Sequence, residues 1–210
     1  MIELAAPALI LPERPALVRA HDMTGIPSFE EMQARQKGMF PFPVFCPGGT
    51  WVPTFSQTLA VDQTSLQNYS FRTVIPAGSI STSGTTIRAT LQASSSASVT
   101  FDNVSIVERS GSTVNGTTAP TALLFSGGAS VTVSAGSSVV SDALSYTLDE
   151  TKDYLLICDI GSSNGGTVRR DDATFLSYYA AAANSWNVQS PGGFSSAAVL
   201  WNVSKLEVFV

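Results

Sequence analysis

The chain has 210 residues and a formal net charge of −5, and only 13% of its residues are charged, against roughly 25% in an average soluble domain. The negative charge argues against a nucleic-acid partner, because phosphate binding needs a positive field. No apolar run reaches the roughly 18–20 residues of a membrane span, and the N-terminus lacks the basic region of a secretory signal. A composition with 44% apolar residues favours a folded core over disorder.

Residues 1–53 form a first region that is rich in proline. Eight of the 11 prolines of the chain lie there. Proline fixes φ, removes a backbone donor and restrains the preceding residue to extended conformations. We therefore predict an extended N-terminal arm over 1–53, without sheet or long helix, ahead of a second domain over 54–210.

One short helix is expected within this arm. Ser28 is a suitable N-cap, Glu31 three residues later completes a capping box, and Gly38 can end the helix. Phe29 and Met32 would then lie on one face of the helix, because they are three residues apart.

The arm also carries more apolar side chains than can bury one another, so it needs a surface to dock on. That surface can be the chain's own second domain or a partner protein, and we favour attachment to a larger assembly. The candidate attachment residues are Phe29, Met32, Phe40, Phe42 and Phe45.

From about residue 54, short alternating runs are separated by clusters of Gly, Ser, Asn and Pro, which predicts an all-β fold, an antiparallel and jelly-roll-like β-sandwich. The polar pair Asp102 and Asn103 interrupts one run and indicates a β-bulge. The last run is apolar to the final residue, so we expect the C-terminus to lie in a sheet. The candidate strands are residues 69–75, 86–92, 98–108, 121–125, 130–133, 139–148, 154–159, 175–179 and 198–210.

The order of these runs resembles the β-sandwich accessory domain found beside some SGNH/GDSL-type hydrolases, and related stand-alone domains in bacteriophage and prophage structural proteins. The segments that carry this resemblance are 86–91, 99–106, 124–128, 130–136, 140–142 and 153–157. The hydrolase itself is absent from the sequence, because neither the Gly-Asp-Ser block nor the Asp-x-x-His block of that family occurs. The resemblance implies a virion protein attached to its particle by the apolar arm.

The sequence contains few residues that could act in catalysis or bind a metal ion. The single histidine, His21, lies among the prolines of the arm, where a pocket with a nucleophile is not expected. Cys46 and Cys158 with one histidine are too few ligands for a zinc site. We expect both thiols to be unpaired, with Cys158 in the core, although a disulfide between them stays open. We predict no enzyme activity, no cofactor and no metal.

A glycan site is the one binding site that the sequence suggests. Tyr178, Tyr179, Asn184 and Trp186 combine aromatic faces with a neighbouring amide, which suits the C–H groups and hydroxyls of a sugar. The alternative is that these aromatic side chains belong to the core or to a subunit interface, and that alternative is favoured.

Charged residues 169–172, Arg-Arg-Asp-Asp, can form an inter-subunit salt-bridge cluster or a calcium loop. We favour a third interpretation, a solvated loop, because exposed charges of this kind are common and contribute little. The Gly-rich segment 161–166 lacks the lysine and the helix of a phosphate loop, so we interpret it as an inter-strand loop.

The leading hypothesis is a structural virion protein, which is a head decoration, fibre or tail component assembled in the bacterial cytoplasm and attached to other virion proteins through residues 1–53. The alternative is a carbohydrate-binding module that contacts host or environmental glycans. We expect a homo-oligomer, because rotational closure satisfies an interface without leaving a free edge. A trimer is expected by analogy with phage fibres. No nucleic acid and no membrane partner are expected.

Overall fold

The computed structural model of the chain describes residues 48–161, 166–172, 176–181 and 184–210. The predicted arm helix, His21, Cys46 and the five candidate attachment residues (Phe29, Met32, Phe40, Phe42 and Phe45) lie outside the described residues. In the described part, every regular element is a strand except one 3-10 turn, Ala77–Ser79. No helix of that part has the length and apolar character needed to cross a membrane.

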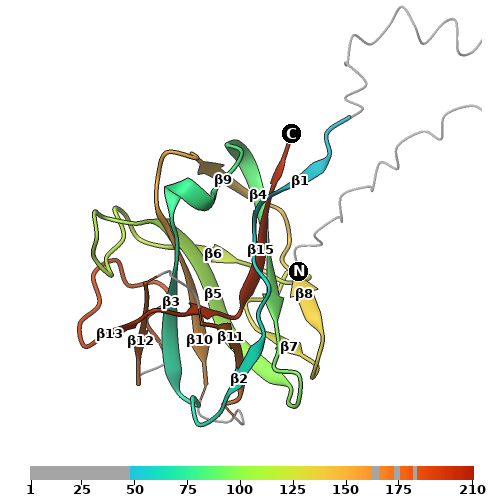
Figure 1. The fold of residues 1–210 in the computed structure, drawn as a ribbon. Helices are drawn as coiled ribbons and strands as arrows, with labels where there is room; N and C mark the ends of the chain where they lie inside the picture. The colour runs from blue at the N-terminus through green and yellow to red at the C-terminus, as the bar shows by residue number, and fades with distance from the viewer. Residues whose placement is uncertain (1–47, 162–165, 173–175, 182–183) are drawn as a thin grey trace, which may run out of the picture. The chain divides into compact units, whose positions relative to one another are not determined.

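Two antiparallel sheets pack face to face and make the predicted β-sandwich (Figure 1). One sheet has the order β1-β15-β4-β8, with β9 also paired to β4, and the other has the order β13-β12-β3-β10-β5-β6, with β7 also paired to β5. The first sheet contains β1 (Trp51–Ser56), β15 (Val203–Phe209), β4 (Gly84–Gln92), β8 (Ser138–Val140) and β9 (Leu144–Leu148). The second contains β13 (Ser195–Ala197), β12 (Ser177–Ala180), β3 (Tyr69–Ile75), β10 (Tyr154–Ile160), β5 (Val99–Glu108), β6 (Thr121–Leu123) and β7 (Val131–Val133).

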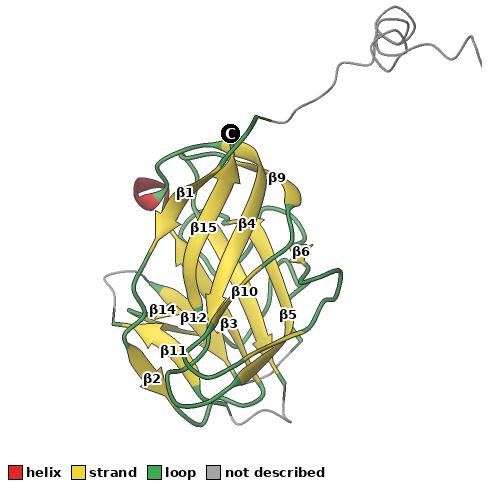
Figure 2. Ribbon diagram, turned by 90° about the vertical axis from the view of Figure 1, so that its right-hand side faces the viewer, coloured by secondary structure: helices red, strands yellow, loops and turns green. Residues whose placement is uncertain are grey.

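A third, small sheet closes one end of the sandwich. Its order is β14-β11-β2. It contains β14 (Leu200–Trp201), β11 (Val168–Asp171) and β2 (Val61–Gln63). These strands lie at the lower end of the molecule in Figure 2, away from the C-terminus.

The core follows from alternation along the strands, because successive side chains of a strand point to opposite faces of its sheet. In β4, Ile87, Ala89 and Leu91 are fully buried between the sheets. The buried Cys158 belongs to the same core and is unpaired, which confirms the prediction for that residue. Burial raises the pKa of its thiol.

The predicted bulge is confirmed in β5. Opposite the bulge, Asp159 and Ile160 of β10 pair with Asn103 and Phe101, so Asp102 has no partner residue across the ladder. Such an extra residue bends a strand and increases its local twist.

The boundary between the two regions differs from the prediction. Residues 51–53, assigned to the arm, are the first residues of β1, in which Trp51 pairs with Phe209 and Pro53 pairs with Glu207. The compact unit of the described chain begins at residue 48. Pro53 is tolerated because β1 is an edge strand and its register shifts between Pro53 and Phe55, and edges and bulges are where a strand accepts proline.

Four strands were not predicted, β1, β2, β11 and β13. The first three pair with strands distant in sequence, whereas β13 pairs with the preceding strand, β12. The predicted strand at 139–148 is two strands, β8 and β9. The predicted C-terminal strand is interrupted at Asn202, which has φ of 57° and separates β14 from β15. The C-terminal segment nevertheless lies in the sheets, as predicted.

Candidate functional site

The predicted glycan residues do not form one surface. Tyr178 and Tyr179 are neighbours in β12, so their side chains lie on opposite faces of the seven-stranded sheet. Tyr178 packs with Val74 and Trp186 on the outer face. Tyr179 packs against the inner core, near Trp201.

Pairing across the sheet explains this division. On the outer face, Tyr178 is opposite Arg72, Arg72 is opposite Ile157, and Ile157 is opposite Ser105. These four residues make one row across β12, β3, β10 and β5. A charged side chain therefore lies in the middle of the outer face of the sheet.

The segment Asn184–Phe194, here called the strap, covers this row. The carboxylate of Asp159 in β10 accepts hydrogen bonds from the backbone N–H groups of Asn184 at 2.8 Å and Trp186 at 3.1 Å. The hydroxyl of Ser105 donates to the carbonyl of Trp186 at 2.5 Å. The backbone of the predicted glycan segment is therefore fixed by buried groups of the sheet.

Arg72 holds the strap from a second position. Its guanidinium donates to the carbonyl of Ser185 at 2.8 Å and to the carbonyl of Val188. It also lies 5.5 Å from the centre of the Phe194 ring. Arg72 is fully buried, and a buried charge needs such partners because it has lost its hydration.

The pKa values in this cluster reflect burial and neighbouring charge. Burial lowers the pKa of Arg72 to about 10, and the charge of Asp159 opposes this shift. Burial raises the pKa of Asp159, while the hydrogen bond from Ser70 and those from the strap oppose the rise. The two opposite charges lie beneath the strap, so we interpret the cluster as a structural anchor.

Tyr178 is likewise engaged within the protein. Its hydroxyl accepts a hydrogen bond from the Arg109 guanidinium at 2.7 Å and donates to the Ser112 carbonyl at 3.2 Å. Trp186 is half-buried and Asn184 is exposed. Of the four predicted residues, Tyr178 and Trp186 therefore belong to the packing of the outer face, and Asn184 lies at its margin.

Tyr179 lines a different feature, a cavity of about 220 Å³ between the small sheet and the edge of the seven-stranded sheet. We call it the end cavity. Its lining residues are Gln63, Leu66, Arg170, Tyr179, Ala197, Val199 and Trp201. The Tyr179 and Trp201 rings are 6.1 Å apart and inclined at 61°, so they meet edge to face.

The end cavity combines these rings with a small number of polar groups. Gln63 supplies an amide, and Arg170 supplies a guanidinium that pairs with the exposed carboxylate of Asp172. The Nε atom of Arg170 and the Nε1 atom of Trp201 are both buried without a hydrogen-bond partner in the described part of the chain. Buried donors of this kind are uncommon in folded proteins.

The charged segment 169–172 is not the solvated loop that the sequence suggested, since most of it is strand β11. Its charges have partners within the chain. Arg169 pairs with Asp62 at 2.6 Å, and Asp171 accepts a hydrogen bond from Gln57 at 2.7 Å. Although burial alone would raise it, hydrogen bonds from Ser95 and Arg169 hold the pKa of Asp62 well below its usual range.

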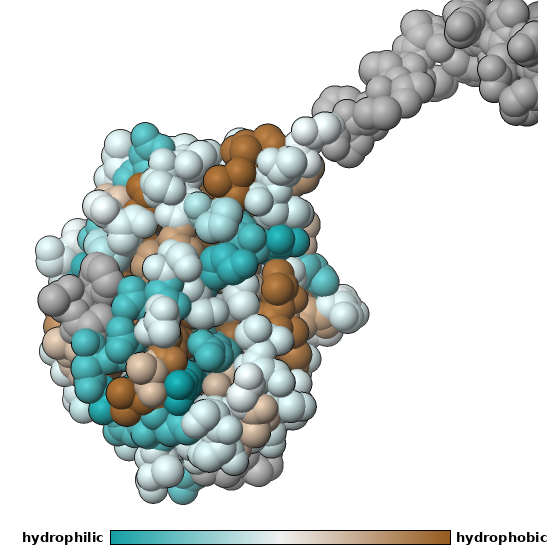
Figure 3. Space-filling model, turned by 45° about the vertical axis from the view of Figure 1, so that its right-hand side comes forward, coloured by the Kyte–Doolittle hydropathy of each residue, from teal (hydrophilic) through white to brown (hydrophobic). Residues whose placement is uncertain are grey.

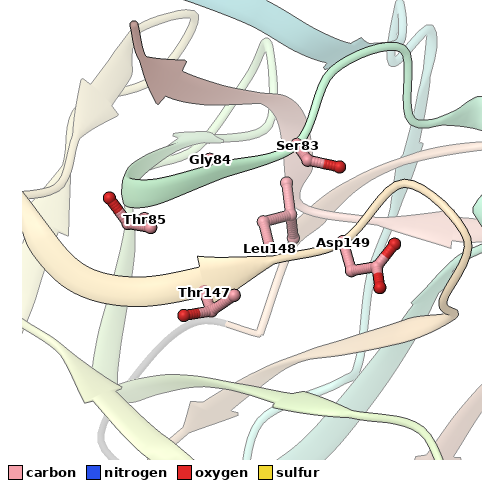
Figure 4. Close-up of a pocket in the computed structure, with 6 residues that line it drawn as sticks. All are labelled: Ser83, Gly84, Thr85, Thr147, Leu148 and Asp149. Atoms are coloured by element: carbon pink, nitrogen blue, oxygen red, sulfur yellow. The ribbon is translucent and has the colours of Figure 1, made fainter.

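Two further hollows lie at the surface, and neither is lined by an aromatic side chain. One, of about 470 Å³, lies between the start of β4 and the end of β9 (Figure 4). Its lining residues are Ser83, Gly84, Thr85, Thr147, Leu148 and Asp149. The other, of about 390 Å³, is polar and is lined by residues of the turns at 108–117 and 151–153.

No group of three or more His, Cys, Asp or Glu residues that could hold a metal ion occurs among the residues described. Sequence reasoning missed the anchor residues Arg72 and Asp159, although each gave a signal, a charged residue inside an otherwise apolar predicted strand. It also missed Gln63 and Trp201, for which no local signal exists. In comparisons with known proteins, no family model matched the chain, and no curated protein was similar to it.

Proposed function

We propose that the chain is a non-catalytic structural protein of a bacteriophage or prophage particle, attached through its N-terminal region and displaying the sandwich. The observation that carries the proposal is that the sandwich begins with β1 at the end where Thr50 pairs with Val210, while the end cavity lies at the other end. A displayed module needs this separation, because its attached end is not available for contacts with the surroundings.

Hydrogen bonds define the first of these ends. Thr50 and Val210 exchange backbone hydrogen bonds, with N···O distances of 2.7 and 3.1 Å. From there β15 and β1 run together through the sandwich (Figure 1). The seven residues of β15 span about 20 Å at the rise of a strand, and beyond their far end lies Trp201 in the lining of the end cavity.

Strand order gives independent support. The first and last strands, β1 and β15, are neighbours, and the chain then alternates between the two sheets in the sequence β1, β3, β4, β5 to β7, β8 and β9, and β10. We interpret this order as a jelly roll, an architecture of viral capsid and lectin domains. The analogy concerns the fold and adds weight to the proposal without assigning a ligand.

The second candidate function is carbohydrate binding, and the end cavity is the observation that favours it. Aromatic side chains, one amide and one guanidinium line a small hollow, which is the composition of small-molecule sites. The two functions are compatible, because a particle protein can display a glycan-binding end.

A homo-oligomer, with a trimer by analogy, is part of the proposal. Both sheets have edge strands, β1 in one and β13 in the other, and edge strands need protection from uncontrolled pairing. The mass of the full-length protein in solution tests this part. A monomer at micromolar concentration contradicts it.

Particle association is the main test. Antibodies against the sandwich should label phage particles of the source in electron microscopy, and full-length protein should sediment with particles that lack it. A variant of the full chain with Phe40, Phe42 and Phe45 replaced by Ser should lose particle association and keep its fold. Retained association in that variant would show that the arm is not the attachment.

Because the sandwich begins before residue 54, the position of an N-terminal truncation decides its effect on folding. Removal of residues 1–47 should leave a folded sandwich, because β1 is kept. Removal of 1–53 should destabilise it, because Trp51, Val52 and Pro53 pair with β15. If removal of 1–47 alone unfolds the sandwich, the arm belongs to the core and the attachment proposal fails.

A further inference from the structure

The end cavity differs from the two surface hollows described above in having aromatic walls. Tyr179 is half-buried, so part of its ring is available to a ligand, while Trp201 lies beside it and is only 3% exposed. Leu66, Ala197 and Val199 complete an apolar lining. Flat apolar walls suit the C–H faces of a sugar ring, and the hollow in Figure 4 has no aromatic side chain to provide one.

The size of the cavity limits what can enter it. A volume of about 220 Å³ is below the roughly 300–1,000 Å³ of sites for drug-sized ligands. The cavity therefore suits one small ring and excludes an extended peptide or an acyl chain. A longer glycan can be held by one terminal sugar with the remainder outside.

Charge decides between an acidic and a neutral ligand. Arg170 is the one cationic residue in the lining, and it is paired with the carboxylate of Asp172. Its neighbours in β11 are engaged elsewhere, Arg169 by Asp62 and Asp171 by Gln57. The region thus has no excess positive charge to attract a carboxylate or phosphate, and the pairing of a guanidinium with a carboxylate offers both donors and acceptors to hydroxyl groups.

Unpaired donors point to the same chemistry. Arg170 and Trp201 each have a buried nitrogen that finds no acceptor among the described residues, and both residues line the cavity. Because these atoms are themselves covered, a ligand has to shift the side chains slightly to reach them. The hydroxyl oxygen of a sugar can accept a hydrogen bond from either N–H group, and its own proton can be donated to another partner.

We propose that the end cavity binds one neutral hexopyranose ring, such as the terminal sugar of a surface glycan. This inference rests on the second candidate function and places it in the end cavity instead of on the strap. Tyr179 provides the stacking surface, while Gln63 and Arg170 select for hydroxyl groups. The site lies at the end of the sandwich opposite the N-terminal attachment, where a displayed protein meets its surroundings.

The test uses the full-length protein labelled with ¹⁵N and the indole N–H signals of its three tryptophans. The probes are the methyl glycosides of glucose, galactose, mannose and N-acetylglucosamine, with glucuronate as the acidic comparison. Trp51→Phe and Trp186→Phe assign two signals, so the buried Trp201 need not be replaced. We expect at least one neutral glycoside to shift the Trp201 signal most, with a Kd on the order of 1 mM, as is usual for a ligand of so few atoms.

A matched pair of variants on β13 provides the control. Ala197→Leu fills the cavity and should weaken binding at least tenfold. Ser196→Leu adds the same bulk at the neighbouring, exposed position and should leave binding unchanged. If no neutral glycoside shifts Trp201, if Ala197→Leu binds as well as the parent, or if glucuronate binds more tightly than every neutral sugar, the proposal is overturned.

Particle association of the Ala197→Leu variant separates this inference from the proposed structural role. If the Ala197→Leu variant still associates with particles but no longer binds sugar, both the sugar site and the structural role are supported. If the parent protein associates with particles but binds none of the sugars, the sugar site is overturned and the structural role is not.

Discussion

The two sheets of the sandwich differ in what covers their outer faces. The middle of the outer face of the seven-stranded sheet lies under the strap, and every residue of β10 is buried. The outer face of the five-stranded sheet is partly open, and Arg88 keeps 29% of its side-chain exposure there. In the view of Figure 3, apolar side chains at the surface gather only in small, separate patches.

Both faces carry an arginine, and the comparison shows what burial demands of it. Under the strap, Arg72 donates to three backbone carbonyls, those of Val114, Ser185 and Val188. On the open face, Arg88 pairs with Glu207 at 2.8 Å and lies 4.4 Å from the centre of the Trp51 ring. The open arginine keeps part of its surface accessible to solvent, whereas the covered one depends on the position of the strap.

The largest effect is expected from Asp159→Ala. This change leaves the backbone N–H groups of Asn184 and Trp186 without their acceptor, and it leaves Arg72 without its neighbouring opposite charge. We expect the free energy of unfolding to fall by about 3–5 kcal/mol, as when one member of a buried charged pair is removed. Urea unfolding measures it.

Asp159→Asn is the matched variant, because it keeps the shape and one acceptor oxygen. It should lose clearly less stability than Asp159→Ala. Equal stability of the Ala variant and the parent would show that the anchor does not hold the strap, and the contrast between the two faces would then have no energetic basis.

A smaller effect is expected from Arg88→Ala on the open face. The exposed guanidinium contributes one cation–π contact and one ion pair, and Lys205, 3.5 Å from Glu207, can still partner that carboxylate. We expect a loss of about 1 kcal/mol. Added salt should reduce the difference between parent and variant, and a loss as large as that of Asp159→Ala would contradict the comparison.

The smallest expected effect is on the free energy of unfolding in acid. Asp62 and Asp159 should change its pH dependence in opposite directions. The folded-state pKa of Asp62 is lowered from 3.8, so its contribution is present above pH 3.8 and is lost as the pH falls through the folded value. The folded-state pKa of Asp159 is raised, so its charged form opposes folding above that value, and this cost disappears as the pH falls toward 3.8.

Replacement of each aspartate by asparagine separates the two contributions. Asp62→Asn should make the loss of stability below pH 4 shallower than in the parent, and Asp159→Asn should make the loss on acidification steeper. Thermal unfolding between pH 2 and 6 follows both. Parallel pH profiles for the two variants and the parent would contradict this assignment.

Several features of the fold could be predicted from the sequence because they depend on neighbouring residues. The alternation in residues 86–92 predicted strand β4, and strand β3 was predicted with its observed bounds. The polar interruption at Asp102 gave the bulge. Arg72 and Asp159 were not predicted, because only the fold showed that a distant segment covers these charged side chains.

The glycan site shows the limit of that reasoning. Tyr178 and Tyr179 are adjacent in sequence, but the pleat of β12 places them on opposite faces, where Tyr178 packs under the strap and Tyr179 lines the end cavity. Their separation follows from the two-residue period of a strand, once the segment is known to be a strand with both faces covered.

By itself the sequence determined an all-β sandwich with a C-terminal strand in its sheets, because alternating polarity and turn residues act over a few neighbouring positions. Only the tertiary structure decided where the sandwich begins and where a ligand can enter. Trp51 belongs to a strand because its partner Phe209 lies at the other end of the chain. The end cavity unites Gln63, Arg170 and Trp201, since antiparallel pairing brings together segments that no local pattern connects.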